Sequence, residues 1–393
     1  MAISVPGFLA SGISSGIKAN NQKDLALLFS EQTATAAGVF TTNQIKAAPV
    51  ILTKDKIKQK TSQAILVNSG NANACTGDMG MKHASDLCKW TAGELGISET
   101  LVMASSTGII GVPLPIDKIK AAIPRLVNAL SQTGLNDFAE AIMTTDTVPK
   151  IVATKARLGG KDVTFCGMAK GSGMIMPRMA TLLTFVITDL AVHPDLLHDV
   201  FLEAVQQSFN QITIDGETST NDMVIMMANG RAGNSFFQNE SSDYHTFTTV
   251  LNTLFFDLSK LILKDAEGAT KTISIRVEEA KSHEEAKKIA YRIGNSNLVK
   301  TAFFGEDPNW GRILSAIGTV DTPIIPDCID ISFDDVMVVK NSTRTGMESR
   351  AKQILKKKEF QVTVNLHMGQ GWAEVGTTDL STEYVRINAS YPS

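Results

Sequence analysis

Thr181 stands where an ordinary buried strand would begin, directly after a segment rich in glycine and methionine. The run 181–190, TLLTFVITDL, is rich in the β-branched and aromatic residues typical of strands. The preceding run 170–180, KGSGMIMPRMA, favours turns. A threonine hydroxyl can attack the carbonyl of the residue before it, and hydrolysis of the resulting ester leaves a chain that begins with threonine. The alternative is that Thr181 is simply a strand residue, and spacing alone does not decide between the two.

A threonine at the start of a chain carries its own base. The freed α-amine has an ordinary pKa of about 7.7 to 8.0, so it can accept the hydroxyl proton near neutral pH. The γ-methyl group restricts χ1 and helps to hold the oxygen in place. This chemistry suits a chain with 6 histidines and no visible Ser/His/Asp pattern.

The elements that must position such a nucleophile are strands and amphipathic helices that alternate along the whole chain, which indicates a mixed α/β fold. Buried strands are predicted at 64–70 and 101–108, and each ends in a small-residue turn whose backbone donors can face a ligand. Helices are predicted at 116–130, 193–209, 248–264 and 282–294, the last opened by the capping-box spacing of Ser282 and Glu285. A half-buried strand is predicted near the end, in FQVTVNLHMG.

Composition favours small-molecule partners. Lys and Arg total 37, Asp and Glu total 40, and the net charge of −3 gives no electrostatic reason to expect nucleic acid or membrane as a partner. The 4 cysteines are scattered, so neither a metal site nor a disulfide framework is indicated. The N-terminus lacks the basic region of a signal peptide, and no apolar run approaches the roughly 20 residues that span a bilayer. We therefore expect a cytoplasmic protein.

The segment MAKGSGMIMPRMATLLTFVITD resembles the cleavage site of the ornithine acetyltransferase family, also called glutamate N-acetyltransferase or the bifunctional protein of arginine biosynthesis. The resemblance extends over nearly the whole chain. It includes the segments VNSGNANACTG, SSTGIIG, IMTTDTVPK, DGETSTND, KDAEGATK, GEDPNWGRI and YVRINASY.

This resemblance implies a self-cleaving acyltransferase. The chain would cut itself between Ala180 and Thr181 into an α chain of residues 1–180 and a β chain of residues 181–393. The Thr181 hydroxyl would take an acetyl group from N2-acetylornithine, release ornithine, and pass the acetyl group to glutamate in a ping-pong scheme. Some members of the family also accept acetyl-CoA as the donor, and no other cofactor is implied.

The resemblance also assigns the site residues. Stabilisation of the oxyanion would come from Thr107 and Gly108 in the SSTG turn. The substrate-binding positions would be Thr147, Lys170, Thr181, Glu267, Asn388 and Ser393. The chain departs from the family pattern at Pro392, where a small hydroxyl residue is expected, and this affects the placement of Ser393.

For the fold, the resemblance implies a layered α/β/α sandwich with two sheets between helices. Its two lobes would meet at the nucleophile, as in N-terminal-nucleophile enzymes but with a different connectivity. The two chains would stay associated through shared core strands and pair again into an α2β2 assembly. We expect the C-terminal run YVRINASYPS to be a strand-like tail that docks on the body.

Two other functions are compatible with the residues. The first is a self-cleaving N-terminal-nucleophile aminopeptidase or amidohydrolase, in which water takes the acyl group. The presence of both Lys170 and Glu267 favours a second amino acid as the acceptor instead. The other is a binding protein without enzymatic activity, in which the chain stays uncut.

Overall fold

The long strand β2 (Leu25–Phe40) is the centre of the larger of two sheets in the computed structural model, which describes residues 3–19, 21–176, 182–237 and 241–390. Its first half pairs with β1 (Phe8–Ile13) and β3 (Thr61–Asn71), and its second half pairs with β8 (Met223–Ala228). The register on β3 shifts between Phe29 and Ala34, where three exposed residues interrupt the buried pattern. The two ends of β2 therefore belong to different parts of the sheet.

The sheet order is β4-β3-β2-β8-β7-β6-β5, with β1 beside β2. The remaining strands are β4 (Val102–Ile109), β5 (Lys150–Leu158), β6 (Lys161–Lys170) and β7 (Leu183–Thr188). Side chains from β1 to β3 and from β6 to β8 share one buried apolar cluster, together with the short helix α4 (Leu135–Ala141). The two halves of the sheet thus pack face to face.

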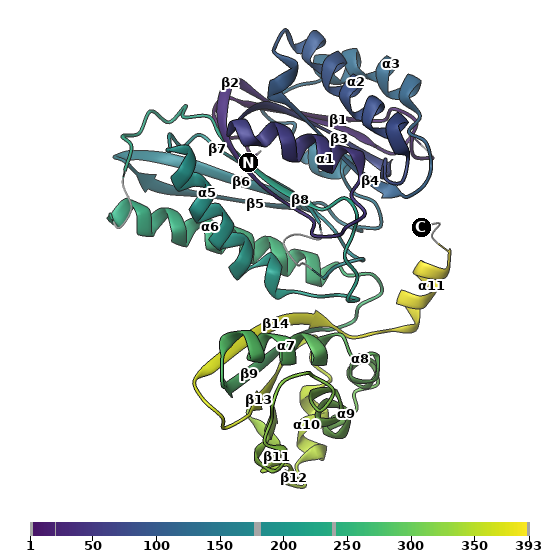
Figure 1. Cartoon of the computed structure of the whole chain (residues 1–393), viewed down its shortest axis with the longest axis vertical. Helices are drawn as coiled ribbons and strands as arrows, with labels where there is room; N and C mark the ends of the chain where they lie inside the picture. Colours follow the sequence, from purple (N-terminus) through teal and green to yellow (C-terminus); the bar gives the residue numbers. More distant parts are fainter. Residues whose placement is uncertain (1–2, 20, 177–181, 238–240, 391–393) are drawn as a thin grey trace.

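Helices cover the two outer faces of the folded sheet (Figure 1). The first face carries α1 (Ala48–Lys56), α2 (Gly77–Leu95) and α3 (Ile116–Asn128), and the second carries α5 (Pro194–Gln207) and α6 (Ser242–Lys264). This helix, sheet, sheet, helix layering confirms the fold class expected from the sequence.

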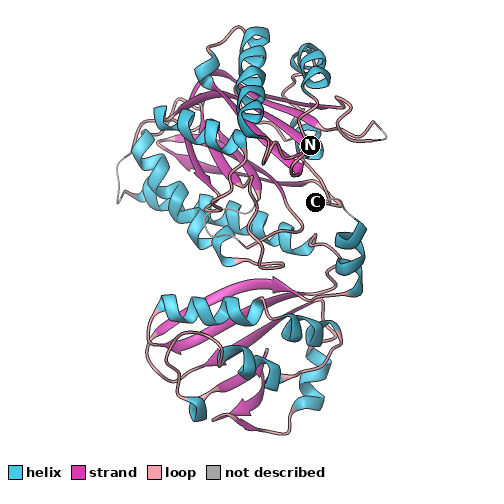
Figure 2. Cartoon of the chain, turned by 45° about the vertical axis from the view of Figure 1, so that its right-hand side comes forward, coloured by secondary structure: helices cyan, strands magenta, loops and turns pink. Residues whose placement is uncertain are grey.

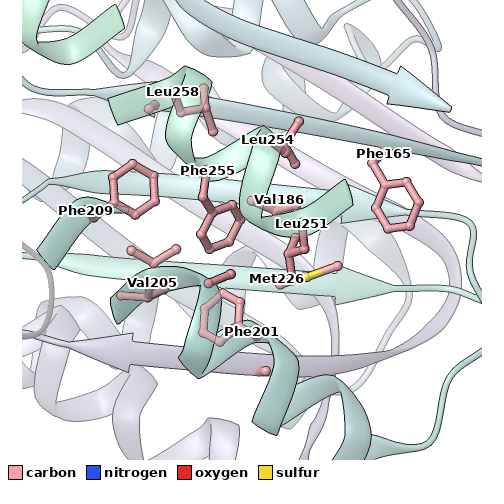
Figure 3. Packing of buried hydrophobic residues seen from close by; sticks show 14 of the residues in the cluster. Phe165, Val186, Phe201, Val205, Phe209, Met226, Leu251, Leu254, Phe255 and Leu258 are labelled. Carbon is pink, nitrogen blue, oxygen red and sulfur yellow. The ribbon is translucent and has the colours of Figure 1, made fainter. Parts of the chain in front are cut away.

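The apolar stripe of α6 packs on α5 and on the strands beneath them (Figure 3). Its buried positions include Leu251, Leu254, Phe255 and Leu258, which have the spacing of one helix face. By length and composition α6 could cross a membrane, but this stripe is buried in the core of the body.

A second lobe is built on a separate six-stranded sheet with the order β12-β11-β10-β13-β9-β14 (Figure 1). Its strands are β9 (Thr272–Ala280), β10 (Asp330–Phe333), β11 (Val336–Lys340), β12 (Thr343–Arg344), β13 (Glu359–Asn365) and β14 (Gly371–Thr378). Its helices are α7 (His283–Gly294), α8 (Asn297–Phe304), α9 (Trp310–Ile317) and α10 (Glu348–Ile354). The predicted cap of α7 is present, because Ser282 accepts a hydrogen bond from the Glu285 amide.

The described part of the chain ends in a helix, α11 (Thr382–Ser390), which leaves the second lobe after β14 and lies beside the first (Figures 1 and 2). The expectation of a strand-like tail was wrong. The helical turn places Tyr384 and Asn388 one above the other, with the Asn388 amide donating to the Tyr384 carbonyl, and an ion pair joins Glu383 to Arg386.

Candidate active site

The site is a cavity of about 150 Å³ where the ends of several strands meet the C-terminus of α6 and the side of α11. Its walls come from seven separate segments of the chain. The lining residues are Thr107, Gly108, Ile110, Thr144, Thr145, Lys170, Gly171, Gly173, Met174, Leu182, Leu183, Ser219, Thr220, Asn221, Asp222, Glu267 and Asn388. Hydroxyl, amide and charged groups of both signs therefore converge on one small space.

The predicted oxyanion pair lies at the end of β4 and lines the cavity. Gly108 has a φ of +132°, which side chains rarely adopt, and a Cβ atom there would lie 2.3 Å from the Gly70 carbonyl carbon on β3. Only glycine lets the two backbones approach this closely. The neighbouring Thr107 also lines the cavity.

Lys170 is the last residue of β6, immediately before Gly171, and its ammonium joins two cavity hydroxyl groups. Its Nζ donates to Thr144 Oγ1 at 2.8 Å and to Thr107 Oγ1 at 3.3 Å. Burial lowers the pKa of Lys170, and nearby carboxylates, Asp146 foremost, oppose that shift. Since the Thr107 oxygen accepts from an ammonium group, its own proton is free to donate to a ligand oxygen.

A fully buried lysine fastens the segments that carry these groups. Lys150 Nζ lies 2.7 Å from Asp146 Oδ1 and 2.5 Å from Asp265 Oδ2. Asp146 also accepts hydrogen bonds from the backbone amides of Gly171 and Thr144. Burial alone would raise the pKa of Asp146, but the ammonium groups of Lys170 and Lys150 and these hydrogen bonds outweigh it and lower the pKa to about 2.

Glu267 places a carboxylate in the cavity just after α6. A Cβ atom at Gly173 would lie 2.4 Å from Glu267 Oε2, so the glycine leaves room for this carboxylate. The Glu267 amide donates to the Ser172 carbonyl at 2.8 Å, and Asn388 Nδ2 donates to Glu267 Oε2 at 2.8 Å. α11 thus supplies part of the cavity wall through Asn388.

The structure brings together Thr107, Gly108, Lys170, Glu267 and Asn388 from the sequence-based assignment. Thr147 lies elsewhere: it is exposed, and its amide and hydroxyl both donate to Asp265, while Thr144 and Thr145 of the same TTDT motif line the cavity. Its substrate-binding role stays a prediction. Ala180, Thr181 and Ser393 lie outside the described residues.

Sequence reasoning missed the contribution of the DGETSTND motif. The family resemblance includes this motif but assigns no role to its last four residues, and all four line the cavity. Asn221 Nδ2 donates to the carbonyls of Ala72 and Ser106, so this segment is held against strand β4. Burial raises the pKa of Asp222 well above its usual range. The sequence feature that could have indicated this role is an acidic residue, Asp222, directly before the apolar strand β8.

Comparison with known proteins shows the family to which the chain is related. Residues 9–393 match the ArgJ family. The chain is 49% identical over 391 residues to the arginine biosynthesis bifunctional protein ArgJ of Geobacter sulfurreducens, covering 99% of this chain and 100% of the relative. It is 46% identical over 391 residues to the protein of the same name from Syntrophotalea carbinolica, with 99% of each covered. A crystal structure of ArgJ from Bacillus halodurans is similar at 40% identity and a TM-score of 0.50, over 52% of this chain and 96% of that one.

A layered α/β body with a cavity lined by hydroxyl groups, a lysine and a glutamate is typical of an enzyme that acts on small molecules. The extent of the match then identifies the family. The chain belongs to the ArgJ family.

Proposed function

We propose that the protein is a glutamate N-acetyltransferase of arginine biosynthesis, which moves an acetyl group from N2-acetylornithine to glutamate through an ester on Thr181. The observation that carries this proposal is the convergence of Thr107, Lys170 and Glu267 on one cavity in a member of the ArgJ family. Leu182 lines the same cavity, and consecutive Cα atoms are about 3.8 Å apart. The covalent bond between Thr181 and Leu182 therefore supports Thr181 as the nucleophile of this cavity.

The charges of the cavity fit a zwitterionic amino acid. Lys170 can hold the α-carboxylate of ornithine or glutamate, and Glu267 can hold an ammonium group. In the first half-reaction the Thr181 oxygen attacks the acetyl carbonyl, ornithine leaves with its α-amine, and the acetyl group stays as an ester. In the second, the α-amine of glutamate attacks that ester and regenerates the hydroxyl. Both steps form an oxyanion, and the position of Thr107 and Gly108 on the cavity wall near the end of β4 supports them as its hydrogen-bond donors.

The sheet topology supports a cut at Ala180–Thr181 that leaves one folded body. β6 would end the α chain and β7 would begin the β chain, and these strands pair from Phe165 opposite Thr188 to Lys170 opposite Leu183. β8 of the β chain also pairs with β2 of the α chain. The solved chain from Bacillus halodurans is about half as long as this one, as expected for one of two pieces.

The proposal also covers a second acetyl donor, the assembly of the chains and the location of the protein in the cell. We expect acetyl-CoA to serve as a second acetyl donor, because the relatives are named bifunctional. An α2β2 assembly and a cytoplasmic location remain predictions.

The aminopeptidase or amidohydrolase alternative shares the self-cleavage and differs in the acceptor. In that case water would take the acyl group, and no second amino acid would need to bind. The opposite charges of Lys170 and Glu267 in one cavity favour an amino-acid acceptor.

Intact-mass spectrometry of the purified protein, followed by incubation with N2-acetylornithine and glutamate, tests the proposal. We expect two pieces split at Ala180–Thr181 and acetyl transfer without CoA, with additional N-acetylglutamate when acetyl-CoA is added. Thr181→Ala should remain uncut and inactive, whereas Thr181→Ser keeps a hydroxyl group and should retain part of both activities. A single uncut mass with full activity would refute the mechanism, and acetate release without transfer would favour the hydrolase.

A further inference from the structure

Asp222 is a buried carboxyl group in the cavity wall that the transfer reaction does not use. It is 3% exposed, and its Oδ2 has no hydrogen-bond partner among the described residues. Burial raises its pKa well above the usual range, and Ser219, Lys170 and Thr41 oppose this only in part. An orphaned buried polar atom of this kind requires an explanation. The group keeps its proton at pH values at which an exposed aspartate is ionised.

The backbone places Asp222 beside the start of β7. β7 and β8 are parallel neighbours, with Leu183 opposite Met223, and the Met223 amide donates to the Leu182 carbonyl at 3.0 Å. Asp222 precedes Met223, as Leu182 precedes Leu183. The peptide bond that is cut in the proposed function ends at Thr181, the residue bonded to Leu182. The buried carboxyl group of Asp222 thus lies at the same end of these two adjacent strands as Leu182, the second residue after the scissile bond in the sequence.

Self-cleavage needs an acid–base group that the finished enzyme does not. The cut protein has the α-amine of Thr181 as its base, but in the uncut chain that nitrogen is an amide and cannot accept the hydroxyl proton. The departing amide nitrogen must also be protonated. The other charged groups of the cavity are engaged, because Lys170 donates to Thr144 and Thr107, and Glu267 accepts from Asn388.

We propose that Asp222 is the acid–base catalyst of self-cleavage, which rests on the proposed function above. The Thr181 Oγ bonds to the Ala180 carbonyl carbon, and the carbon–nitrogen bond breaks. Asp222 gives its proton to the departing nitrogen through one oxygen and takes the hydroxyl proton on the other, so the acid is regenerated. Water then hydrolyses the ester, leaving the Ala180 carboxyl group and the Thr181 hydroxyl.

The test follows the rate of self-cleavage of freshly translated full-length chains by intact mass. Asp222→Asn keeps the shape of the side chain but cannot relay a proton, and it should slow cleavage by about 100-fold or more, since acid–base groups contribute about 10² to 10⁴ in rate. Asp222→Ala should be equally slow and should be accelerated by added formate, a response that a structural role would not produce. Cleavage of Asp222→Asn at the wild-type rate would overturn the proposal.

Asp189→Asn is the matched control. Asp189 is also 3% exposed, its pKa is also raised by burial, and it follows the opposite end of β7 from the cavity. This variant should cut itself at the wild-type rate. A wild-type chain that stays uncut would contradict the proposed function itself, whereas equal cleavage of wild type and Asp222→Asn would contradict only the role of Asp222.

The wild-type chain supplies a measurement that needs no variant. Because the protonated carboxyl group is the active form, the rate of self-cleavage should fall as pH rises through the raised pKa of Asp222. Lys170 from β6 and Glu267 after α6 are the other charged groups that line the cavity among the described residues. Lys170→Met and Glu267→Gln should therefore keep a fall of the same sign. A rate that rises steadily with pH in the wild type would count against an acid as the catalyst.

Discussion

At the scale of the residue, the contact between Lys170 and Thr107 predicts a kinetic signature. If Lys170 only held a carboxylate, Lys170→Met would raise KM and leave kcat unchanged. Because its ammonium also orients the Thr107 hydroxyl, 3.3 Å away, we expect kcat to fall by about 10² to 10³ as well. Steady-state kinetics of acetyl transfer, measured on fully cut protein, separate the two effects.

Lys56→Met is the control for this variant. Lys56 is a partly buried lysine that donates to the carbonyls of Glu99 and Val102, at the opposite end of β4 from the cavity. The Lys56→Met variant should have a lower free energy of unfolding and unchanged kcat and KM. An unchanged kcat in Lys170→Met would show that the lysine serves binding alone.

At the scale of the element, the buried ammonium group of Lys150 at the start of β5 connects two other segments. It pairs with Asp146 in the segment after α4 and with Asp265 at the end of α6. Lys150→Met would leave the carboxylates of Asp146 and Asp265 buried beside each other without their cation. Breaking a buried pair in this way costs about 3 to 5 kcal/mol. We expect a loss of that size in the free energy of unfolding in urea, against less than about 0.5 kcal/mol for the exposed Lys54→Met. A small loss in Lys150→Met would mean that water reaches the cluster.

The same cluster predicts a loss of stability in acid. The pKa of Asp146 is lowered to about 2 in the folded chain and is about 3.9 when unfolded, so the unfolded chain binds its proton first as pH falls. The stabilisation is complete above about pH 5 and is lost as pH falls toward 2. Asp146→Asn should flatten this part of the profile of unfolding free energy against pH, and an unaltered slope would contradict the assignment.

At the scale of the whole molecule, the boundary between the two lobes does not coincide with the proposed cut. The β chain would supply β7, β8, α5 and α6 to the first lobe and all of the second. Because β7 lies between β6 and β8, the cut pieces should elute together in size exclusion and separate only in denaturant. Native and denaturing mass spectrometry of the cut protein check this, and pieces that separate in native buffer would contradict it.

The sequence alone determined the features that depend on neighbouring residues. The cap at Ser282, the strands that end at the SSTG and VNSG turns and the apolar stripe of α6 follow from spacing and from hydrogen bonds within a few residues. Its resemblance to a family also identified Thr107, Lys170 and Glu267, and all three line one cavity.

Only the tertiary structure decided what surrounds those residues. Thr144, Thr145 and Asp222 become cavity residues because strands far apart in the chain end at the same edge, and no local pattern reports that meeting. α11 is helical although its apolar residues suggested a strand, since a short apolar run fits either period until its partners are known. The charge states of the buried carboxyl groups also depend on the tertiary structure. A carboxyl group with a pKa of about 2 at Asp146 and one kept neutral at Asp222 differ in their buried neighbours, which only folding brings together.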